Sequence, residues 1–183
     1  MTDASAYVAN EVLRNGLEVC IRASRPEDWD LVVTAFHALE KESIYLRFFG
    51  NKKELSEAEA RQFRETDFKS RVRLLCTIVI DQQEIVIGVA SYARVGESAA
   101  EVAFVVEEDY HGLGIARRLL NHLGRIATDA GISEFIAETL PNNTAMLSVF
   151  SRCGWPMKSH FSDGAVHVSL DLGGAGRREL IDE

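Results

Sequence analysis

The sequence predicts an α/β protein of the α+β type, with a mixed, mainly antiparallel sheet of six to seven strands and helices on both faces. Short β-branched runs recur along the chain, and amphipathic helical patterns separate them. In residues 99–120 an apolar strand passes through a glycine-rich turn directly into an amphipathic helix. The 183 residues, 46% of them hydrophobic, suit one domain with a core of normal size. We expect that domain at residues 18–172, with an N-terminal extension at 1–17 and a flexible tail at 173–183.

The first half of the chain contains one expected strand and two expected helix starts. Residues 18–23 have the pattern of a first strand. Ser24 and Glu27 have the spacing of a capping box, which predicts that a helix begins there. Ser56 and Glu59 repeat this spacing and predict a second, shorter helix.

The second half alternates strands and helices. Two β-branched runs separated by Asp-Gln-Gln-Glu predict a hairpin. The helix after the glycine-rich turn has one apolar face, and Gly131 is its natural C-cap. Asp163 and Gly164 predict the turn of a last hairpin. The expected elements are strands at 71–80, 85–95, 100–106 and 134–140, and helices that begin at 113 and span 142–152.

Charge and hydropathy exclude several classes of protein. The net charge of −8 argues against a nucleic-acid partner, because phosphate contacts supply most of that affinity. A negative field would attract a basic substrate, although acidity also serves solubility alone. The apolar runs are far shorter than a membrane span, and the first residues lack the pattern of a signal peptide. We therefore expect a cytoplasmic protein that does not associate with membranes.

The cysteines and histidines do not predict a metal site. Cys20, Cys76 and Cys153 are odd in number and widely spaced, which argues against a disulfide framework and against a metal cage. The histidines show no metal-ligand spacing with acids or cysteines. We expect the cysteines in or near the core.

The turn HGLGIA at residues 111–116 predicts an anion site. The first turn of a helix has backbone N–H groups without intrahelical partners at the positive end of its dipole, where a phosphate fits. Gly112 and Gly114 remove bulk where a pyrophosphate would approach the main chain. Arg117 and Arg118 are cations at an unfavourable end of the helix dipole, which an adjacent polyanion would explain, unless both are simply solvated.

The spacing separates three phosphate-binding designs. A P-loop requires a Gly-Lys-Ser/Thr triplet, which the sequence lacks. The dinucleotide fingerprint matches only at Gly112 and Gly114, because Arg117 occupies the position of its third small residue. The turn instead resembles the Q/R-x-x-G-x-G/A turn of the GNAT superfamily of N-acetyltransferases, which binds the pyrophosphate of coenzyme A.

The resemblance covers residues 21–172. The segment LPNNTAMLSVFSRCGW at 140–155 is similar to the family's fifth strand, loop asparagine and fourth helix. IRASRPEDWD and ESIYLRFFG, at 21–30 and 42–50, resemble one branch, the acetyltransferase domains of bacterial protein lysine acetyltransferases, which modify acyl-CoA synthetases.

This resemblance implies an enzyme that uses acetyl-CoA without a metal. It transfers the acetyl group to a primary amine by direct attack, and a protein lysine, possibly on an acyl-CoA synthetase, is the leading acceptor. A small-molecule amine is the alternative acceptor, and a CoA-binding sensor or partner-binding module without turnover is the alternative function. The protein would act as a monomer or a homodimer.

Two carboxylates are candidates for the base that deprotonates the amine. In many GNAT enzymes this base is a glutamate on the fourth strand, and Glu101 matches that place. Beside Ala103 and Val105, its carboxylate would have a raised pKa if buried, whereas at a hairpin end it would be solvated. Glu138, a charge in the middle of an apolar strand, is the second candidate for base or substrate anchor. Glu107, Glu108 and Asp109 are expected to face solvent.

The resemblance also assigns the cofactor site. Asn143 corresponds to the loop asparagine that contacts the pantetheine arm, whereas Asn142 and Thr144 would cap the following helix, unless these roles are exchanged. His111 replaces the usual Gln or Arg of the turn and either donates to a phosphate or lies on the surface. The expected cofactor-binding residues are Phe104, Val105, Val106, His111, Gly112, Leu113, Gly114, Ile115, Ala116, Arg117 and Asn143.

Two further positions concern the reacting groups. Phe150 replaces the tyrosine that many members use as general acid, so the CoA thiolate would leave without that proton donor. A thiol pKa of about 8.5 makes this leaving group tolerable. The aromatic segment with Tyr45, Leu46, Phe48 and Phe49 is expected to form the acceptor-side wall or, in part, to pack in the core.

Overall fold

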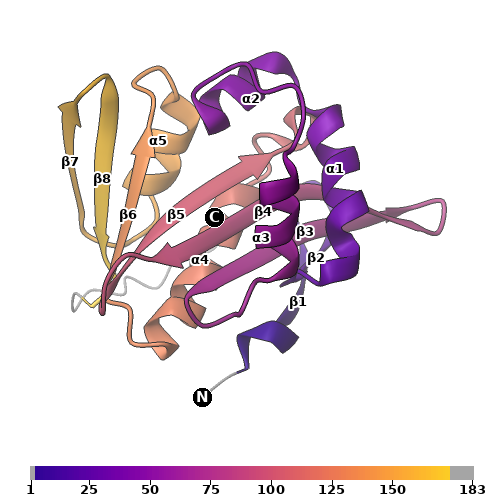
Figure 1. The fold of residues 1–183 in the computed structure, drawn as a ribbon, viewed down its shortest axis with the longest axis horizontal. Coiled ribbons are helices and arrows are strands. Elements are labelled where there is room, and N and C mark those ends of the chain that lie inside the picture. The colour runs from indigo at the N-terminus through magenta and orange to yellow at the C-terminus, as the bar shows by residue number, and fades with distance from the viewer. Residues whose placement is uncertain (1–2, 174–183) are drawn as a thin grey trace.

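A computed structural model describes residues 3–173, which form one eight-stranded sheet in the order β1-β2-β3-β4-β5-β6-β8-β7. Neighbouring strands are antiparallel except β5 and β6, which are parallel (Figure 1). The mixed, mainly antiparallel sheet is confirmed, but it is larger than the predicted six to seven strands. The strands are β1 (Val8–Val12), β2 (Glu18–Ala23), β3 (Arg71–Ile80), β4 (Gln83–Arg94), β5 (Ala99–Val106), β6 (Glu134–Thr139), β7 (Met157–Ser162) and β8 (Ala165–Asp171).

Helices cover both faces of the sheet. Helices α1, α2 and α3 lie over one face, and α4 crosses the other (Figure 1). Their bounds are α1 (Trp29–Ala38), α2 (Lys41–Phe48), α3 (Glu57–Arg64), α4 (Ile115–Asp129) and α5 (Thr144–Ser151), with single 3-10 turns η1 (Ala4–Ala6), η2 (Pro26–Asp28) and η3 (Glu108–Tyr110). The apolar face of α4 supplies Leu119, Leu120 and Leu123, all fully buried, to the main core against the sheet.

The eighth strand comes from the segment expected to be an N-terminal extension. Strand β1 pairs with β2 from Val8 to Val12, so this part of residues 1–17 belongs to the sheet. Its pattern conceals the strand, because Val8 and Val12 are exposed while the intervening Glu11 faces α4. Residues 174–183 of the expected tail lie outside the described residues.

Buried polar contacts attach β1 to α4. The Glu11 carboxylate pairs with Arg118 and accepts a hydrogen bond of 2.6 Å from Nε2 of the buried His122. The hydroxyl of Tyr7 bonds to the other ring nitrogen of His122. The N-terminal segment is therefore held against the helix that follows the glycine-rich turn.

The second capping box is confirmed, and the first is displaced. Ser56 Oγ accepts from the N–H of Glu59, whose carboxylate accepts from the N–H of Ser56. At the first helix, the carboxylate that accepts a backbone N–H is Asp28, which bonds to Arg25 at 2.7 Å. The prediction of a box formed by Ser24 and Glu27 is therefore wrong.

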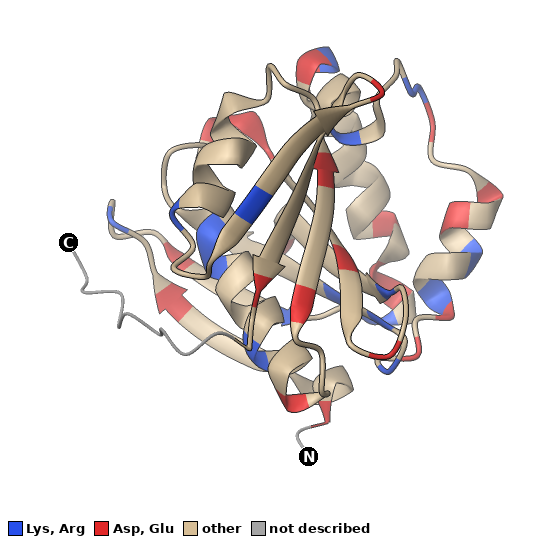
Figure 2. Ribbon diagram, turned by 90° about the vertical axis from the view of Figure 1, so that its left-hand side faces the viewer, with Lys and Arg blue, Asp and Glu red and all other residues tan. Residues whose placement is uncertain are grey.

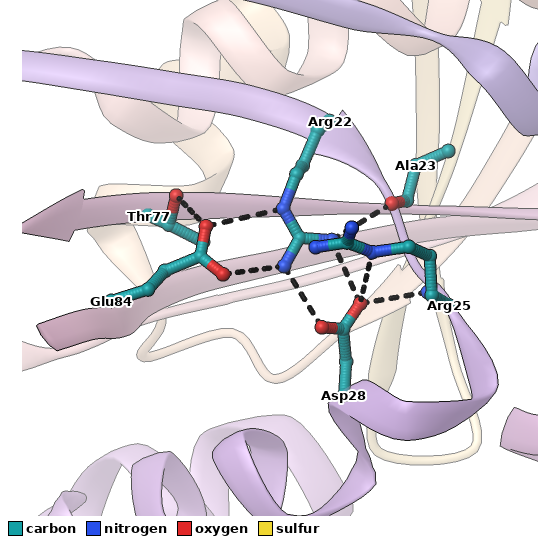
Figure 3. Close-up of polar contacts among 6 residues, drawn as sticks. All are labelled: Arg22, Ala23, Arg25, Asp28, Thr77 and Glu84. Carbon is teal, nitrogen blue, oxygen red and sulfur yellow. Dashed lines mark hydrogen bonds and ion pairs between the residues drawn. The ribbon is translucent and has the colours of Figure 1, made fainter.

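Asp28 takes this place because a buried arginine holds it there. Arg22 donates from both terminal nitrogens to Asp28, at 2.7 and 2.8 Å, and also contacts Glu84 at 2.7 Å (Figure 3). The side chain of Thr77 adds a hydrogen bond to Glu84. This network joins the start of α1 to strands β2 and β4.

The described residues contain no helix long and apolar enough to cross a membrane. Cys20, Cys76 and Cys153 are free, and Cys76 and Cys153 are buried.

Charges of both signs are interspersed on the side of the molecule formed by β7 and β8 (Figure 2).

Candidate active site

The main groove opens where two parallel strands separate. Strands β5 and β6 pair only from Ala99 to Glu101 and from Glu134 to Ile136, although both strands continue beyond these residues. The other edge of β5 is paired with β4 along nearly the whole length of β5. The separation therefore exposes only the edge of β5 that faces β6. The resulting groove has a volume of about 640 Å³ and extends to the start of α4.

The glycine-rich turn lies at one end of this groove. Gly112 and Gly114 have φ angles of +76° and +83°, a conformation that side-chain-bearing residues rarely adopt. Gly114 is the N-cap of α4 and supplies no capping side chain, so the first N–H groups of this helix stay free for a ligand. A Cβ built on Gly112 would meet nothing within 4 Å, so this glycine is required by its backbone conformation.

Two arginines flank the turn, and sequence reasoning found only one of them. Arg117 lines the groove as predicted. Arg14, in the β1–β2 connection, also lines it, with Nη2 3.6 Å from the position of a Cβ on Gly114. Arg118, the other arginine of the motif, is instead paired with Glu11.

A hydrogen bond from the side chain of His111 stabilises the turn. Its Nε2 lies 2.6 Å from the carbonyl oxygen of Val106, so this nitrogen carries the proton and donates it. In the neutral ring the other nitrogen has no proton to give to a phosphate. The contact fixes the end of β5 to the start of the turn.

Most of the expected cofactor-binding residues line this groove, and two positions differ from the expectation. Leu113 is not among the lining residues, because its side chain packs against the core. Asn143, rather than Asn142 or Thr144, caps α5 by accepting from the N–H of Met146 at 3.2 Å. Its side chain still borders the groove, and so do Phe104, Val105, Val106, His111, Gly112, Gly114, Ile115, Ala116 and Arg117.

The middle of the groove contains an unsatisfied hydroxyl. Thr139 is 3% exposed and lines the groove, and its Oγ1 has no hydrogen-bond partner within the described part of the chain. A buried polar group without a partner is costly, and a ligand amide or thioester in the groove would satisfy it. Nothing in the sequence distinguishes this threonine from other strand threonines.

Phe150 lies in the same groove. It is 1% exposed, and its ring packs edge-on against Phe104, with 6.1 Å between the ring centroids. An aromatic ring without a hydroxyl therefore occupies the position where the family resemblance would place a tyrosine.

Glu101 lies where β5 and β6 diverge. Its carboxylate is exposed and borders the groove, so the apolar burial suggested by its strand neighbours does not occur. Within residues 3–173 it makes no ion pair or hydrogen bond, which leaves both oxygens available to an acceptor.

Glu138 borders the same groove from β6 and has a histidine partner. Its Oε1 lies 3.3 Å from Nδ1 of His167, the residue opposite it on β8. His167 in turn stacks on His160 of β7, with ring centroids 4.9 Å apart. Glu138 and the unpredicted His167 thus form a polar contact beside Glu101.

A second cavity, of about 150 Å³, lies between the sheet and helices α1 to α3. It shares Arg47, Phe48, Ala103 and Val105 with the groove, so the two spaces adjoin. Of the expected acceptor wall, Phe48 borders both spaces, Leu46 and Phe49 border the groove, and Tyr45 is exposed and borders neither.

The three acids before the turn, Glu107, Glu108 and Asp109, were expected to face solvent, and they do not all do so. Glu107 lines the second cavity, where burial raises the pKa of its carboxyl, and only Asp109 is fully exposed. The carboxylate of Glu108 accepts from the N–H of Glu40 at 2.8 Å and thereby fixes the start of α2.

The fold agrees with the comparisons to known proteins. A family model described as the acetyltransferase (GNAT) domain matches residues 18–156, and the chain belongs to this family. The chain is thus a GNAT-type acetyltransferase, as its sequence predicted. Residues 3–173 contain no cluster of three or more His, Cys, Asp or Glu side chains that could hold a metal ion.

The similar proteins include members of the predicted branch. The GNAT domain of S. lividans PAT is 34% identical, with a TM-score of 0.82 over 90% of this chain and 96% of that one. Acetyltransferase PA5475 of Pseudomonas aeruginosa is 27% identical over 146 residues, which cover 79% of this chain and 78% of the relative. Acetyltransferase Pat of Mycolicibacterium smegmatis is 39% identical over 90 residues, 48% of this chain but 24% of the relative.

Proposed function

We propose that this protein transfers the acetyl group of acetyl-CoA to a primary amine, and that the acceptor is a protein lysine. The observation that carries the lysine assignment is the likeness to the GNAT domain of S. lividans PAT over nearly the full length of both chains. The groove supports the cosubstrate, because it joins a free helix N-terminus to an exposed strand edge.

Each part of the groove has a chemical role in this proposal. The N–H groups of the first turn of α4, with Arg14 and Arg117, bind the phosphates of CoA. The Thr139 hydroxyl and the free edge of β5 bind the pantetheine arm and the thioester. These contacts orient the thioester toward the end of the groove where Glu101 lies.

The transfer then needs one base and one hydrogen-bond donor. Glu101 accepts a proton from the acceptor ammonium, and the resulting amine nitrogen attacks the thioester carbonyl carbon. A backbone N–H on the free edge of β5 stabilises the oxygen that becomes negative. The attacking nitrogen gives its second proton to water, the intermediate collapses with cleavage of the C–S bond, and CoA leaves as a thiolate, which is protonated from solvent because Phe150 has no proton to give.

A calorimetric titration with acetyl-CoA, followed by a thiol-release assay, tests the proposal. The acceptors are lysine peptides, polyamines and an acyl-CoA synthetase. We expect binding and release that depends on the lysine acceptor. Release with polyamines alone would assign a small-molecule enzyme, binding without release would assign a sensor, and absence of binding would refute the cosubstrate.

Two variants separate binding from chemistry. Glu101→Gln should lower kcat by about 10²- to 10⁴-fold with nearly unchanged acetyl-CoA affinity, because it removes only the proton acceptor. Gly114→Glu should weaken acetyl-CoA binding severely, because it puts bulk, strain and negative charge into the turn. An unchanged rate in the first variant would remove Glu101 as the base, and wild-type affinity in the second would contradict the phosphate site.

A further inference from the structure

The second cavity adjoins the candidate base along a row of cross-strand partners. Arg73 of β3 is opposite Ser91 of β4, which is opposite Ala103 of β5. Cross-strand partners project to the same face of a sheet, and Glu101 lies two residues from Ala103 on that face. The cavity therefore extends from Ala103 toward Arg73 beneath α2 and α3, and it adjoins the groove that Glu101 borders.

Two arginines reach this cavity without a carboxylate partner. Arg47 of α2 lies over the ring of Phe48, at 4.9 Å, and makes no hydrogen bond or ion pair with any described residue. Arg73 lies over Phe63, at 4.8 Å, and donates one hydrogen bond, to Oγ1 of Thr66 at 2.9 Å. Most N–H donors of both guanidinium groups are therefore unused.

The surrounding charges do not neutralise this pair. Burial, together with the positive charges of Arg71 and Arg47, lowers the pKa of Arg73 to about 10. Burial also lowers the pKa of Arg47, against the attraction of Glu59 and Glu101.

Neither of the two acids that line the cavity, Glu59 and Glu107, forms an ion pair with Arg47 or Arg73. Glu59 is paired with Lys52 at 3.1 Å and accepts the N–H of Ser56. Burial raises the pKa of Glu107, and within residues 3–173 its carboxyl makes no ion pair with either arginine. Two partly desolvated cations thus face one small space, and an anion that enters it would satisfy donors that the protein leaves free.

We propose that this cavity is an acceptor subsite for a carboxylate group, which Arg47 and Arg73 bind while the amine of the same acceptor reaches Glu101. The inference rests on the proposed acetyl transfer and specifies its acceptor. The carboxylate belongs either to a free amino acid or to an acidic side chain beside the modified lysine. A polyamine is a poor acceptor, because its second ammonium would meet two guanidinium groups.

Matched acceptors test the subsite. Each acceptor is compared with its neutral isostere: an amino acid with its carboxamide, and a lysine peptide flanked by glutamate with the same peptide flanked by glutamine. We expect the carboxylate member of at least one pair to have a kcat/KM about tenfold or more higher, mainly through KM, because it gains charged hydrogen bonds. The pair that shows the difference identifies the source of the carboxylate.

The variants Arg47→Met and Arg47→Lys show whether the arginine produces this preference. Arg47→Met should reduce the ratio to within about twofold, and Arg47→Lys, which keeps the charge without the planar fork, should give an intermediate ratio. Arg61→Met is the matched control, since Arg61 is exposed on α3 and does not line the cavity. Its ratio should equal that of the wild type.

A binding measurement separates this inference from the proposed function. Calorimetric titration of the CoA-saturated protein with the same acceptors requires no turnover. Carboxylate-selective binding that Arg47→Met abolishes supports the subsite, even if no acceptor releases thiol and the proposed transfer fails. Equal affinity and equal kcat/KM within every pair, or a preference that survives in folded Arg47→Met protein, would overturn it.

Discussion

Arginines on one face of the same sheet differ in whether a carboxylate pairs with them. Arg22 is 7% exposed and donates to both Asp28 and Glu84 at 2.7 to 2.8 Å (Figure 3). Arg73 and Arg47, on the same side of the sheet, have no carboxylate within hydrogen-bonding distance among the described residues. A saturated guanidinium joins secondary structures, whereas an unsatisfied one in a cavity is available to a ligand.

The end of the groove at the glycine-rich turn shows the same contrast. Arg118 is paired with Glu11 and attaches β1 to α4. Arg14 and Arg117 line the groove without an ion pair in the described structure. Pairing, more than position in a motif, separates the structural arginines from those that we assign to ligands.

The largest effect on the free energy of unfolding is expected when the paired Arg22 is replaced. Arg22→Met should lower the free energy of unfolding by about 3–5 kcal/mol, because Asp28, 2% exposed, would lose its two-point ion pair and keep only its contacts to Arg25. Urea denaturation monitored by circular dichroism measures the change. Arg64→Met, at an exposed position on α3, is the control and should change stability by no more than about 0.5 kcal/mol. A loss for Arg22→Met as small as that of the control would remove the distinction between the two clusters.

The paired cluster should also give stability an acid limit. The pKa of Glu84 is lowered, chiefly by Arg22; burial raises that of Asp28, but hydrogen bonds from Arg22 and Arg25 outweigh it and lower the pKa overall. A lowered folded-state pKa gives stability that is present above the unfolded values, about 3.9 and 4.3, and is lost as the pH falls through the folded ones.

The stability difference between wild type and Arg22→Met should therefore be largest above about pH 5 and shrink toward pH 3. Urea titrations at several pH values measure it. A difference that is constant with pH would show that the arginine acts through packing alone.

A smaller effect is expected for the unpaired arginine at the phosphate turn. Arg14→Met should weaken acetyl-CoA binding about tenfold, with less dependence on salt, while the unfolding free energy stays nearly constant. Titrations with acetyl-CoA and its dephospho form would show whether Arg14 contacts the 3′-phosphate or the pyrophosphate. Unchanged affinity for both ligands would remove Arg14 from the site.

The smallest effect on stability is expected at the acceptor cavity. Arg47→Met should change the free energy of unfolding by no more than about 0.5 kcal/mol, or raise it slightly, because it removes a partly desolvated charge without breaking an ion pair. The same urea titrations measure this change. A loss comparable to that of Arg22→Met would show that Arg47 is structural and would remove it from the arginines that we assign to ligands.

Local patterns predicted the features that depend on neighbours in the chain. The positive φ angles of Gly112 and Gly114 and the reciprocal cap of Ser56 and Glu59 follow from residues a few positions apart. The strand pattern and the family resemblance likewise put Glu101 on β5, although the end of its parallel pairing with β6 depends on a distant segment. For the glycines and the cap, the chemistry of one turn fixes the position.

Local patterns failed where distant side chains compete for a place. Asp28 replaced the predicted cap because Arg22 holds it. Strand β1 was missed because its valines face solvent and Glu11 faces inward.

By itself, the sequence determined the fold class and the enzyme family, and it predicted the glycine-rich turn and the candidate base, because each depends on short-range spacing in the chain. Only the tertiary structure decided that Arg14 meets Gly114, and that Arg47 and Arg73 face one cavity without an ion pair to any described carboxylate. Sheet register and helix docking bring these residues together from distant parts of the chain, and no local pattern records which cations will lack a partner.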